Sequence, residues 1–181
     1  TSHPWDFSSD MIDTIAKYDN IMPYIHLPIQ SGSDNILKKM NRRYTIEEYK
    51  KLFYELKSKI KNVSITTDII VGFPNETEED FQKTLDIYNE LKYDLAYTFI
   101  YSPREGTPAS KMEDSVPLEE KEERLQRLNK IVNKYAKEAN EKYLGKTVPV
   151  LLEGYSDKGG KLMGYTDTMK LVNVAADPSL I

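Results

Sequence analysis

The chain has 181 residues, of which 39% are hydrophobic and 30% are charged, and its net charge is −4. This length and composition are sufficient for a hydrophobic core and predict one large domain with an appendage. The sequence contains no cysteine, which excludes disulfides and thiolate metal ligands within these residues. We expect a soluble, cytoplasmic protein, because no apolar run reaches membrane-span length and the first ten residues do not resemble a signal peptide.

The charge is unevenly distributed along the chain. Acidic residues are in excess before residue 121, whereas basic residues are in excess after it. This asymmetry is compatible with an RNA-contacting module in the last third. A solvated helix of mixed charge would give the same pattern.

Four segments in the first part of the chain repeat one pattern, in which a strand ends in polar or glycine-rich residues and a capped helix follows. The four predicted strands end at His3, Gln30, Gly72 and Ser102. Their spacing is typical of parallel βα repeats, whose right-handed crossovers bring the carboxyl ends of the strands to one edge. Ligands bind at that edge in α/β barrels.

The predicted elements follow from hydrophobic period and capping signals. In chain order we expect a strand ending near residue 3, a helix over 9–18, a strand over 24–30, a short helix over 31–40, a helix over 45–59, a strand over 64–71, a helix over 78–91 and a strand over 95–102. Thr45 and Glu48 form a capping-box pattern, and Asn75 or Thr77 can cap the helix over 78–91.

A long helix is predicted to run from 115 or 117 to 144, where Gly145 ends it. Three short strands follow, over 147–153, 161–165 and 171–174, with a hairpin turn at 157–160. Apolar residues recur along one stripe of the helix, at Leu118, Leu125, Leu128, Val132, Tyr135, Ala139 and Tyr143. We therefore divide the chain into an α/β part, residues 1–145, and a small all-β part, residues 146–181.

Polar residues at the strand ends are the candidate binding residues. Asp68 interrupts the apolar strand over 64–71, and a carboxylate there is costly unless it faces a group that requires it. Gln30 ends the preceding strand, and Arg42 lies in the next connection. Taken singly, each residue has an equally good structural interpretation: Gln30 as a helix cap, and Arg42 as a partner of helix carbonyls.

Two other groups of residues have alternative interpretations. His3, His26 and Asp68 allow a metal-site hypothesis, but two histidines on separate strands are a weak signal. Tyr97, Phe99 and Tyr101 alternate on one strand face, which indicates barrel filling more than a base-stacking platform.

We also expect the sequence to be a piece of a longer protein. It begins at the end of a predicted strand, and four parallel strands cannot close a barrel. The fold class is therefore α/β, specifically the C-terminal half of a partial βα barrel, followed by a short, incomplete all-β segment.

Five motifs in fixed order carry a resemblance to a known family. They are LPIQSGS at 27–33, RRYT at 42–45, TTDIIVGFPNETEEDF at 66–81, FIYSPREGTPA at 99–109 and EERLQRLN at 122–129. Together they closely resemble the methylthiotransferase family of radical S-adenosylmethionine enzymes, and within it the branch that modifies tRNA. The segment from about residue 147 resembles the start of a TRAM domain, a small RNA-binding β-barrel.

The resemblance implies a two-part reaction in a complete enzyme. A reduced 4Fe–4S cluster delivers an electron to S-adenosylmethionine, and a methylthio group is then inserted at C2 of an N6-isopentenyl-type adenosine beside the anticodon. The family's cluster-binding cysteines are absent here, so we expect the chain alone to be inactive. The implied partner is the tRNA anticodon stem-loop, no membrane is involved, and the sulfur donor stays open.

The resemblance also implies residue roles. Arg42 matches a cofactor carboxylate partner, Gln30 and Asp68 match ribose-binding residues, and the backbone of Ile70 and Gly72 matches the strand that approaches adenine. The resemblance to TRAM and the basic excess together predict phosphate contacts by Lys146, Lys158, Lys161 and Lys170. No catalytic residue and no metal ligand is assigned within the chain.

Two alternative functions stay open at this stage. One keeps the chemistry but changes the substrate to an aspartate side chain of a ribosomal protein. The other is a non-catalytic RNA-binding scaffold that retained the barrel and lost the cluster. A C-x-x-x-C-x-x-C motif upstream would separate an enzyme from a scaffold.

Overall fold

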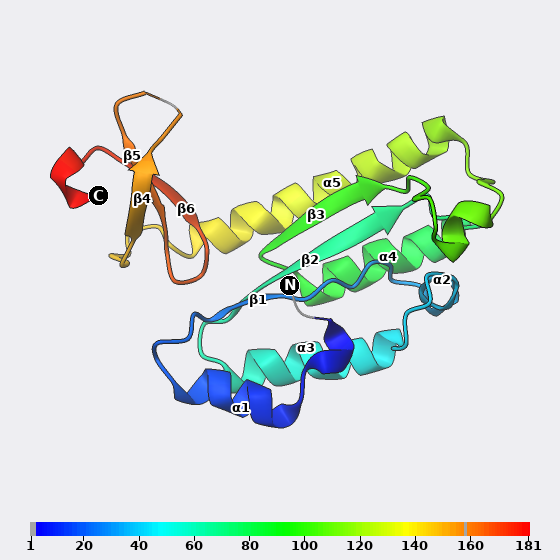
Figure 1. Cartoon of the computed structure of the whole chain (residues 1–181), viewed down its shortest axis with the longest axis horizontal. Coiled ribbons are helices and arrows are strands. Elements are labelled where there is room, and N and C mark those ends of the chain that lie inside the picture. The colour runs from blue at the N-terminus through cyan, green and yellow to red at the C-terminus, as the bar shows by residue number, and fades with distance from the viewer. Residues whose placement is uncertain (1–2, 158) are drawn as a thin grey trace.

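The computed structural model describes residues 3–157 and 159–181. It contains a parallel sheet packed against helices and a separate antiparallel sheet (Figure 1). The elements are η1 (Pro4–Asp6), α1 (Ser9–Lys17), β1 (Tyr24–His26), α2 (Asp34–Lys39), α3 (Ile46–Lys59), β2 (Ser64–Val71), α4 (Glu78–Leu91), β3 (Leu95–Ile100), η2 (Pro108–Lys111), α5 (Leu118–Glu141), β4 (Leu151–Tyr155), β5 (Leu162–Tyr165), β6 (Leu171–Val174) and η3 (Pro178–Leu180). The predicted α/β class is therefore confirmed.

The larger sheet has the order β1-β2-β3, and both neighbouring pairs are parallel. Its core face is formed by apolar side chains from each strand, including Ile25, Ile65 and Ile69, which pack with buried residues of α3, α4 and α5. The carboxyl ends of the strands lie at one edge, as βα connectivity requires. The other face is open, since Tyr97 is 48% exposed and Phe99 is 51% exposed.

The predicted strand ending at His3 falls on Thr1 and Ser2, which lie outside the described residues, and on His3, which is in no strand. Pro4–Asp6 form a 3-10 turn instead, and the His3 side chain accepts a hydrogen bond from the Trp5 backbone N–H. Pro4 has no N–H for a strand ladder and its fixed φ suits the start of a helical turn. The parallel sheet therefore has three strands in the part of the chain that the structure describes, while Thr1 and Ser2 lie outside it.

The first observed strand is shorter than predicted. β1 ends at His26, and the chain beyond it stays beside β2 through hydrogen bonds from the Leu27 and Ile29 N–H groups and an isolated bridge between Gln30 and Ile69. Pro28 lies between these points and cannot donate to the ladder. The structure therefore presents Gln30 on a short irregular segment rather than at the end of a regular strand.

Helix starts follow the predicted capping signals. Thr45 and Glu48 form a complete capping box at α3. Thr77 rather than Asn75 caps α4, with Asp80 completing a second capping box. Asn75 instead adopts a left-handed conformation with φ of 61° in the preceding loop.

The buried stripe of α5 is confirmed only in part. Leu128, Val132, Tyr135 and Ala139 are buried, but Leu118 is 63% exposed because it begins the helix beyond the edge of the core. Two charged residues near the same end, Lys121 and Arg124, are buried instead.

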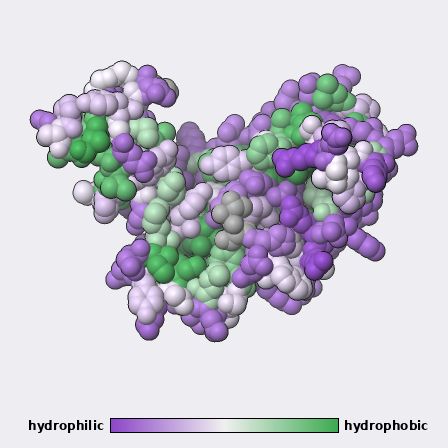
Figure 2. Space-filling view, in the orientation of Figure 1, coloured by the Kyte–Doolittle hydropathy of each residue, from purple (hydrophilic) through white to green (hydrophobic). Residues whose placement is uncertain are grey.

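The small sheet has the order β4-β5-β6 with antiparallel pairing. It forms a lobe that projects from the larger part, and Figure 2 shows hydrophobic residues exposed on it. Leu151, Tyr155 and Leu171 are each more than half exposed. Two polar contacts join this lobe to the rest: the Tyr143 hydroxyl lies 2.6 Å from Thr168 Oγ1, and Lys170 Nζ lies 3.4 Å from the Asp94 carbonyl oxygen.

Candidate functional site

The carboxyl edge of the parallel sheet brings Gln30 and Asp68 together. The backbone N–H of Gln30 donates to the Asp68 carbonyl oxygen at 2.9 Å, and the N–H of Ile70 donates to the Gln30 carbonyl oxygen at 2.9 Å. Gln30 has a φ of 68°, which is uncommon for a residue with a side chain. Such strain persists only where surrounding contacts hold it, and it is concentrated at functional sites.

The Asp68 carboxylate lies on the open face of the sheet in a row of polar side chains. Its Oδ2 is 3.3 Å from His26 Nε2, and the two side chains are 27% and 16% exposed. His26 Nδ1 is 2.9 Å from Thr66 Oγ1, whose other neighbour is the Tyr24 hydroxyl at 3.1 Å. Asp68 is thus a partly exposed carboxylate with the His26 imidazole on one side, and its oxygens can accept further hydrogen bonds.

His26 is a site residue to which sequence reasoning assigned no binding role. It was considered only for the metal alternative. The signal that identifies it is the parallel register, which sets His26 opposite Thr66, two residues before Asp68 on β2.

The loop that carries Gln30 is fixed against α4. Gly32 approaches the helix so closely that a Cβ atom there would lie 2.5 Å from the Lys83 carbonyl oxygen and 2.5 Å from Thr84 Cα. Its N–H donates to Thr84 Oγ1 at 2.9 Å. The hydroxyl of Ser33 donates to Asp80 at 2.6 Å. The backbone at Gln30 is therefore held by a rigid neighbour, as a preorganised site requires.

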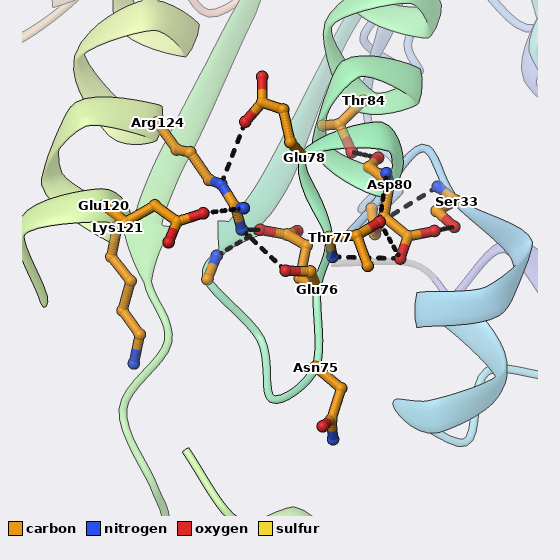
Figure 3. A network of polar contacts seen from close by, with 12 residues as sticks. Ser33, Asn75, Glu76, Thr77, Glu78, Asp80, Thr84, Glu120, Lys121 and Arg124 are labelled. Atoms are coloured by element: carbon orange, nitrogen blue, oxygen red, sulfur yellow. Dashed lines mark hydrogen bonds and ion pairs between the residues drawn. The ribbon is translucent and has the colours of Figure 1, made fainter. Parts of the chain in front are cut away.

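Asp80 is the anchor that receives these bonds. Burial raises the pKa of its carboxyl, but hydrogen bonds from Ser33, the Thr77 backbone N–H and Asn35 outweigh burial and lower the pKa below its ordinary value. The side chain is consequently ionised at neutral pH and accepts bonds from two different loops (Figure 3).

The loop after β2 is held from within and from α5. Gly72 has a φ of 69°, and its N–H donates to Glu76 Oε2 at 2.7 Å. The guanidinium of Arg124 donates to the same oxygen at 2.9 Å and to the Glu76 carbonyl oxygen at 3.1 Å (Figure 3). Burial raises the pKa of the Glu76 carboxyl, while the Gly72 N–H and Arg124 act in the opposite direction.

Arg42 follows α2 and is half-buried. Its N–H donates to the Leu37 carbonyl oxygen at 2.8 Å, and its Nε has no hydrogen-bond partner among the described residues. It lies near Tyr44, whose pKa is raised to about 12 by burial, with Arg42 opposing the shift. The Tyr44 hydroxyl donates to the carbonyl oxygens of Pro28 and Ile29 beside Gln30. Contact between Arg42 and a ligand stays a prediction.

The predicted RNA-binding lysines differ in their surroundings. Lys146 and Lys161 are exposed. Lys170 is half-buried, and burial lowers the pKa of its ammonium. Lys158 lies outside the described residues.

Lys170 also lines a cavity of about 610 Å³ between the small sheet and the amino-terminal end of the parallel strands. Tyr24, Tyr97, Tyr143 and Tyr165 line the same cavity. The beginnings of β2 and β3 border it, so it lies toward the edge opposite to Gly72.

The metal alternative gains no support from the geometry. Residues 3–157 and 159–181 contain no group of three or more His, Asp and Glu side chains placed to hold a metal ion. His3 packs edge-on against the Tyr44 ring with centroids 5.8 Å apart, rather than beside His26. Over the same described ranges, no helix is long and apolar enough to cross a membrane.

Comparison with known proteins gives matches along the whole chain. A family model of the radical SAM superfamily matches residues 1–87, and a model of the TRAM domain matches residues 141–181. A tRNA-2-methylthio-N(6)-dimethylallyladenosine synthase of Staphylococcus aureus strain MRSA252 is 55% identical over 100% of the chain, as is that of strain JH9. The chain is therefore similar along its whole length to one part of these synthases.

The synthases that it matches are longer than this chain, which spans 35% of their length. Two solved structures share its fold. An Escherichia coli coproporphyrinogen III oxidase, described as a radical SAM enzyme, has a TM-score of 0.62 at 21% identity, over 74% of this chain and 31% of its own. The archaeal Methanocaldococcus infernus Elp3 has a TM-score of 0.57 at 17% identity, over 93% of this chain and 54% of its own.

Proposed function

We propose that this chain supplies the S-adenosylmethionine-holding half of a radical barrel and an RNA-binding domain to a cytoplasmic tRNA methylthiotransferase. The complete enzyme inserts a methylthio group at C2 of an N6-dimethylallyl-type adenosine in the tRNA anticodon stem-loop. One observation carries the proposal: Gln30 is hydrogen-bonded to the backbone of Asp68 and Ile70, just before β2 ends at Val71 and leads into Gly72, in a chain 55% identical to synthases of that name.

The residues at the edge fit a nucleoside cofactor. The partly exposed carboxylate of Asp68 can accept hydrogen bonds from ribose hydroxyls, because His26 occupies one side of it and leaves the group accessible. We assign the adenine contact to the backbone of Ile70 and Gly72, although the space that a Gly72 Cβ atom would occupy is filled by the Lys121 side chain. The unpartnered Nε of Arg42 is suited to a carboxylate. S-adenosylmethionine, when bound, supplies the radical chemistry of this family.

The residues do not fit the second cofactor of the family. A 4Fe–4S cluster is held by thiolates, and none of the 181 residues is cysteine. We therefore assign to this chain the holding of the organic cofactor and of RNA, and assign cluster ligation to the additional length that its relatives possess.

Cofactor binding is tested in the enzyme that contains this chain together with that additional length. Asp68→Asn should weaken S-adenosylmethionine binding and lower deoxyadenosine formation, because the amide is a poorer acceptor for two hydroxyls. Asp167→Asn, an exposed aspartate on the small lobe, is the matched control and should leave both unchanged. Equal binding by the Asp68 variant and the control would contradict the cofactor role.

Catalysis by the chain alone provides a second test. The purified 181-residue chain and the longer enzyme are each reconstituted with iron and sulfide, and deoxyadenosine formation is assayed. We expect turnover only in the longer enzyme. Cluster-dependent turnover by the chain alone would refute the assignment of cluster ligation to the additional length. Methylthiolation of a ribosomal protein instead of tRNA would identify the alternative substrate, an aspartate side chain of a ribosomal protein.

RNA binding is tested on the two exposed lysines. Lys146→Gln with Lys161→Gln should weaken tRNA binding and flatten its dependence on salt, since each lost phosphate contact lowers the log–log slope by roughly 0.7 to 0.9. Lys17→Gln on α1 is the charge-matched control. Lys170→Gln should weaken tRNA binding less than the exposed pair does, because the Lys170 ammonium donates to the Asp94 carbonyl oxygen. An unchanged salt slope in the double variant would count against the RNA-binding role.

A further inference from the structure

Arg124 is a buried arginine on α5 that contacts the loop after β2. Only 1% of its side chain is exposed, and the Glu76 side chain is also 1% exposed. The guanidinium donates to both the backbone oxygen and the carboxylate of Glu76, and it also pairs with Glu120 one turn earlier on the same helix (Figure 3). Its flat face lies over the Phe81 ring of α4, 5.7 Å from the centroid.

Through Glu76, this contact reaches the end of β2. Glu76 Oε2 accepts from the Gly72 N–H at 2.7 Å and from Arg124 at 2.9 Å. The two ends of the loop, Gly72 and Glu76, are therefore tied to one guanidinium. Lys121 completes the grip, since its stem fills the space beside Gly72, and its ammonium is held by Asp114 at 2.6 Å.

Helix packing alone does not require this arrangement. A buried ion pair costs desolvation, and an apolar pair of similar volume often stabilises a protein as well or better. An apolar pair, however, cannot hold the Gly72 N–H and the Glu76 carbonyl in fixed directions. The ion pair can, because the Glu76 carboxylate accepts from the Gly72 N–H while the planar fork of Arg124 donates to that carboxylate and to the Glu76 carbonyl oxygen.

We propose that Arg124, acting through Glu76, is a positioning residue that fixes the Gly72 loop for the adenine end of S-adenosylmethionine. The inference deepens the proposed function and rests on it. Since α5 ends at Glu141 and leads into the small sheet, the helix that adjoins the RNA-binding domain also sets the cofactor loop.

The test uses the enzyme that contains this chain with the additional length of its relatives, and compares three variants. Arg124→Met removes the hydrogen bonds from the guanidinium to Glu76, and Arg124→Met with Glu76→Met removes both charges of the buried pair. Arg127→Met is the matched control, because Arg127 lies one turn further along α5 and pairs with Glu78 at 2.7 Å while being 32% exposed. The measurements are the Kd for S-adenosylmethionine by equilibrium dialysis, the iron content and the thermal midpoint.

Arg124→Met should raise the Kd about tenfold or more, since loss of positioning at a preorganised site is costly, whereas Arg127→Met should leave the Kd within about twofold. Iron content should not change. The double variant should recover the thermal midpoint, because no uncompensated charge stays buried, while its Kd stays high. Recovery of stability without recovery of affinity separates positioning from a merely structural role.

Two results would overturn the inference while leaving the proposed function intact. One is an unchanged Kd in Arg124→Met in an enzyme whose wild-type form binds S-adenosylmethionine. The other is a Kd that returns to the wild-type value in the double variant along with the thermal midpoint. Failure of the wild-type enzyme to bind S-adenosylmethionine would refute the proposed function and this inference together. If Arg124→Met does not fold, the Kd of the double variant is the deciding measurement: a high Kd supports positioning by Arg124, and a wild-type Kd overturns it.

Discussion

Replacing Gly72 by alanine tests whether the loop after β2 is shaped by its contact with α5. Gly72 has a φ of 69°, and a Cβ atom there would lie 2.3 Å from Lys121 Cγ and 2.7 Å from Lys121 Cδ. The left-handed conformation costs an alanine about 1–2 kcal/mol. Overpacking against a side chain that cannot move away adds about 1–3 kcal/mol. Lys121 is restrained because its ammonium is bound to Asp114.

Gly106→Ala is the matched control for this experiment. Gly106 has a φ of 83°, but nothing lies within 4 Å of its Cβ position, so only the conformational cost applies. We expect Gly72→Ala to lower the free energy of unfolding by about 2–5 kcal/mol and Gly106→Ala by about 1–2 kcal/mol, from the same two terms. Urea unfolding followed by circular dichroism measures both. Equal losses in the two variants would show that Lys121 does not confine the loop.

Three further outcomes are expected from the structure. Leu128→Ala removes a fully buried side chain of α5 and should lower the free energy of unfolding in urea by about 2–5 kcal/mol. Leu118→Ala, at a 63% exposed position, should change it by less than about 0.5 kcal/mol. Similar losses in the two variants would contradict the observed buried stripe. The pKa of Asp80 in the folded protein lies below its ordinary value of 3.8. Its contribution to stability is therefore complete above pH 3.8 and is lost as the pH falls through the folded pKa. In Asp80→Asn, the free energy of unfolding in urea should depend less on pH across the acidic range. Burial raises the pKa of Tyr44 from 10.0 to about 12, so its contribution to stability is complete below pH 10.0 and is lost as the pH rises through about 12. In an absorbance titration, Tyr44→Phe should lose part of the tyrosinate signal that appears only at the highest pH. An unchanged titration curve would argue against the burial of Tyr44.

The sequence alone determined those features that depend on neighbouring residues. The capping box at Thr45 was predicted because a cap and its N3 partner lie three residues apart, and Thr77 was one of the two caps predicted for α4. The strand over Ser64–Val71 and the helix over Glu78–Leu91 were predicted at their observed bounds from hydrophobic period and turn residues. The order of five motifs indicated a resemblance to methylthiotransferases, and the comparisons confirmed that resemblance.

Local patterns failed where a longer-range partner was decisive. Leu118 fits the apolar period of α5 but lies beyond the surface that the helix covers, so it is exposed. The spacing of apolar residues predicts which side of a helix is buried, but it does not predict where the surface that covers that side ends.

Tertiary structure decided which polar residues are buried and what they contact. Arg124 and Glu76 are 48 residues apart, so no local pattern could pair them, and an arginine on a charged helix is ordinarily exposed. The approach of His26 to Asp68 depends on the parallel register of β1 and β2, which is set by packing across the sheet. The chemistry of the candidate site was therefore readable from residue types, whereas its positioning shell exists only in the folded chain, because burial and long-range hydrogen bonds are properties of segments brought together by the core.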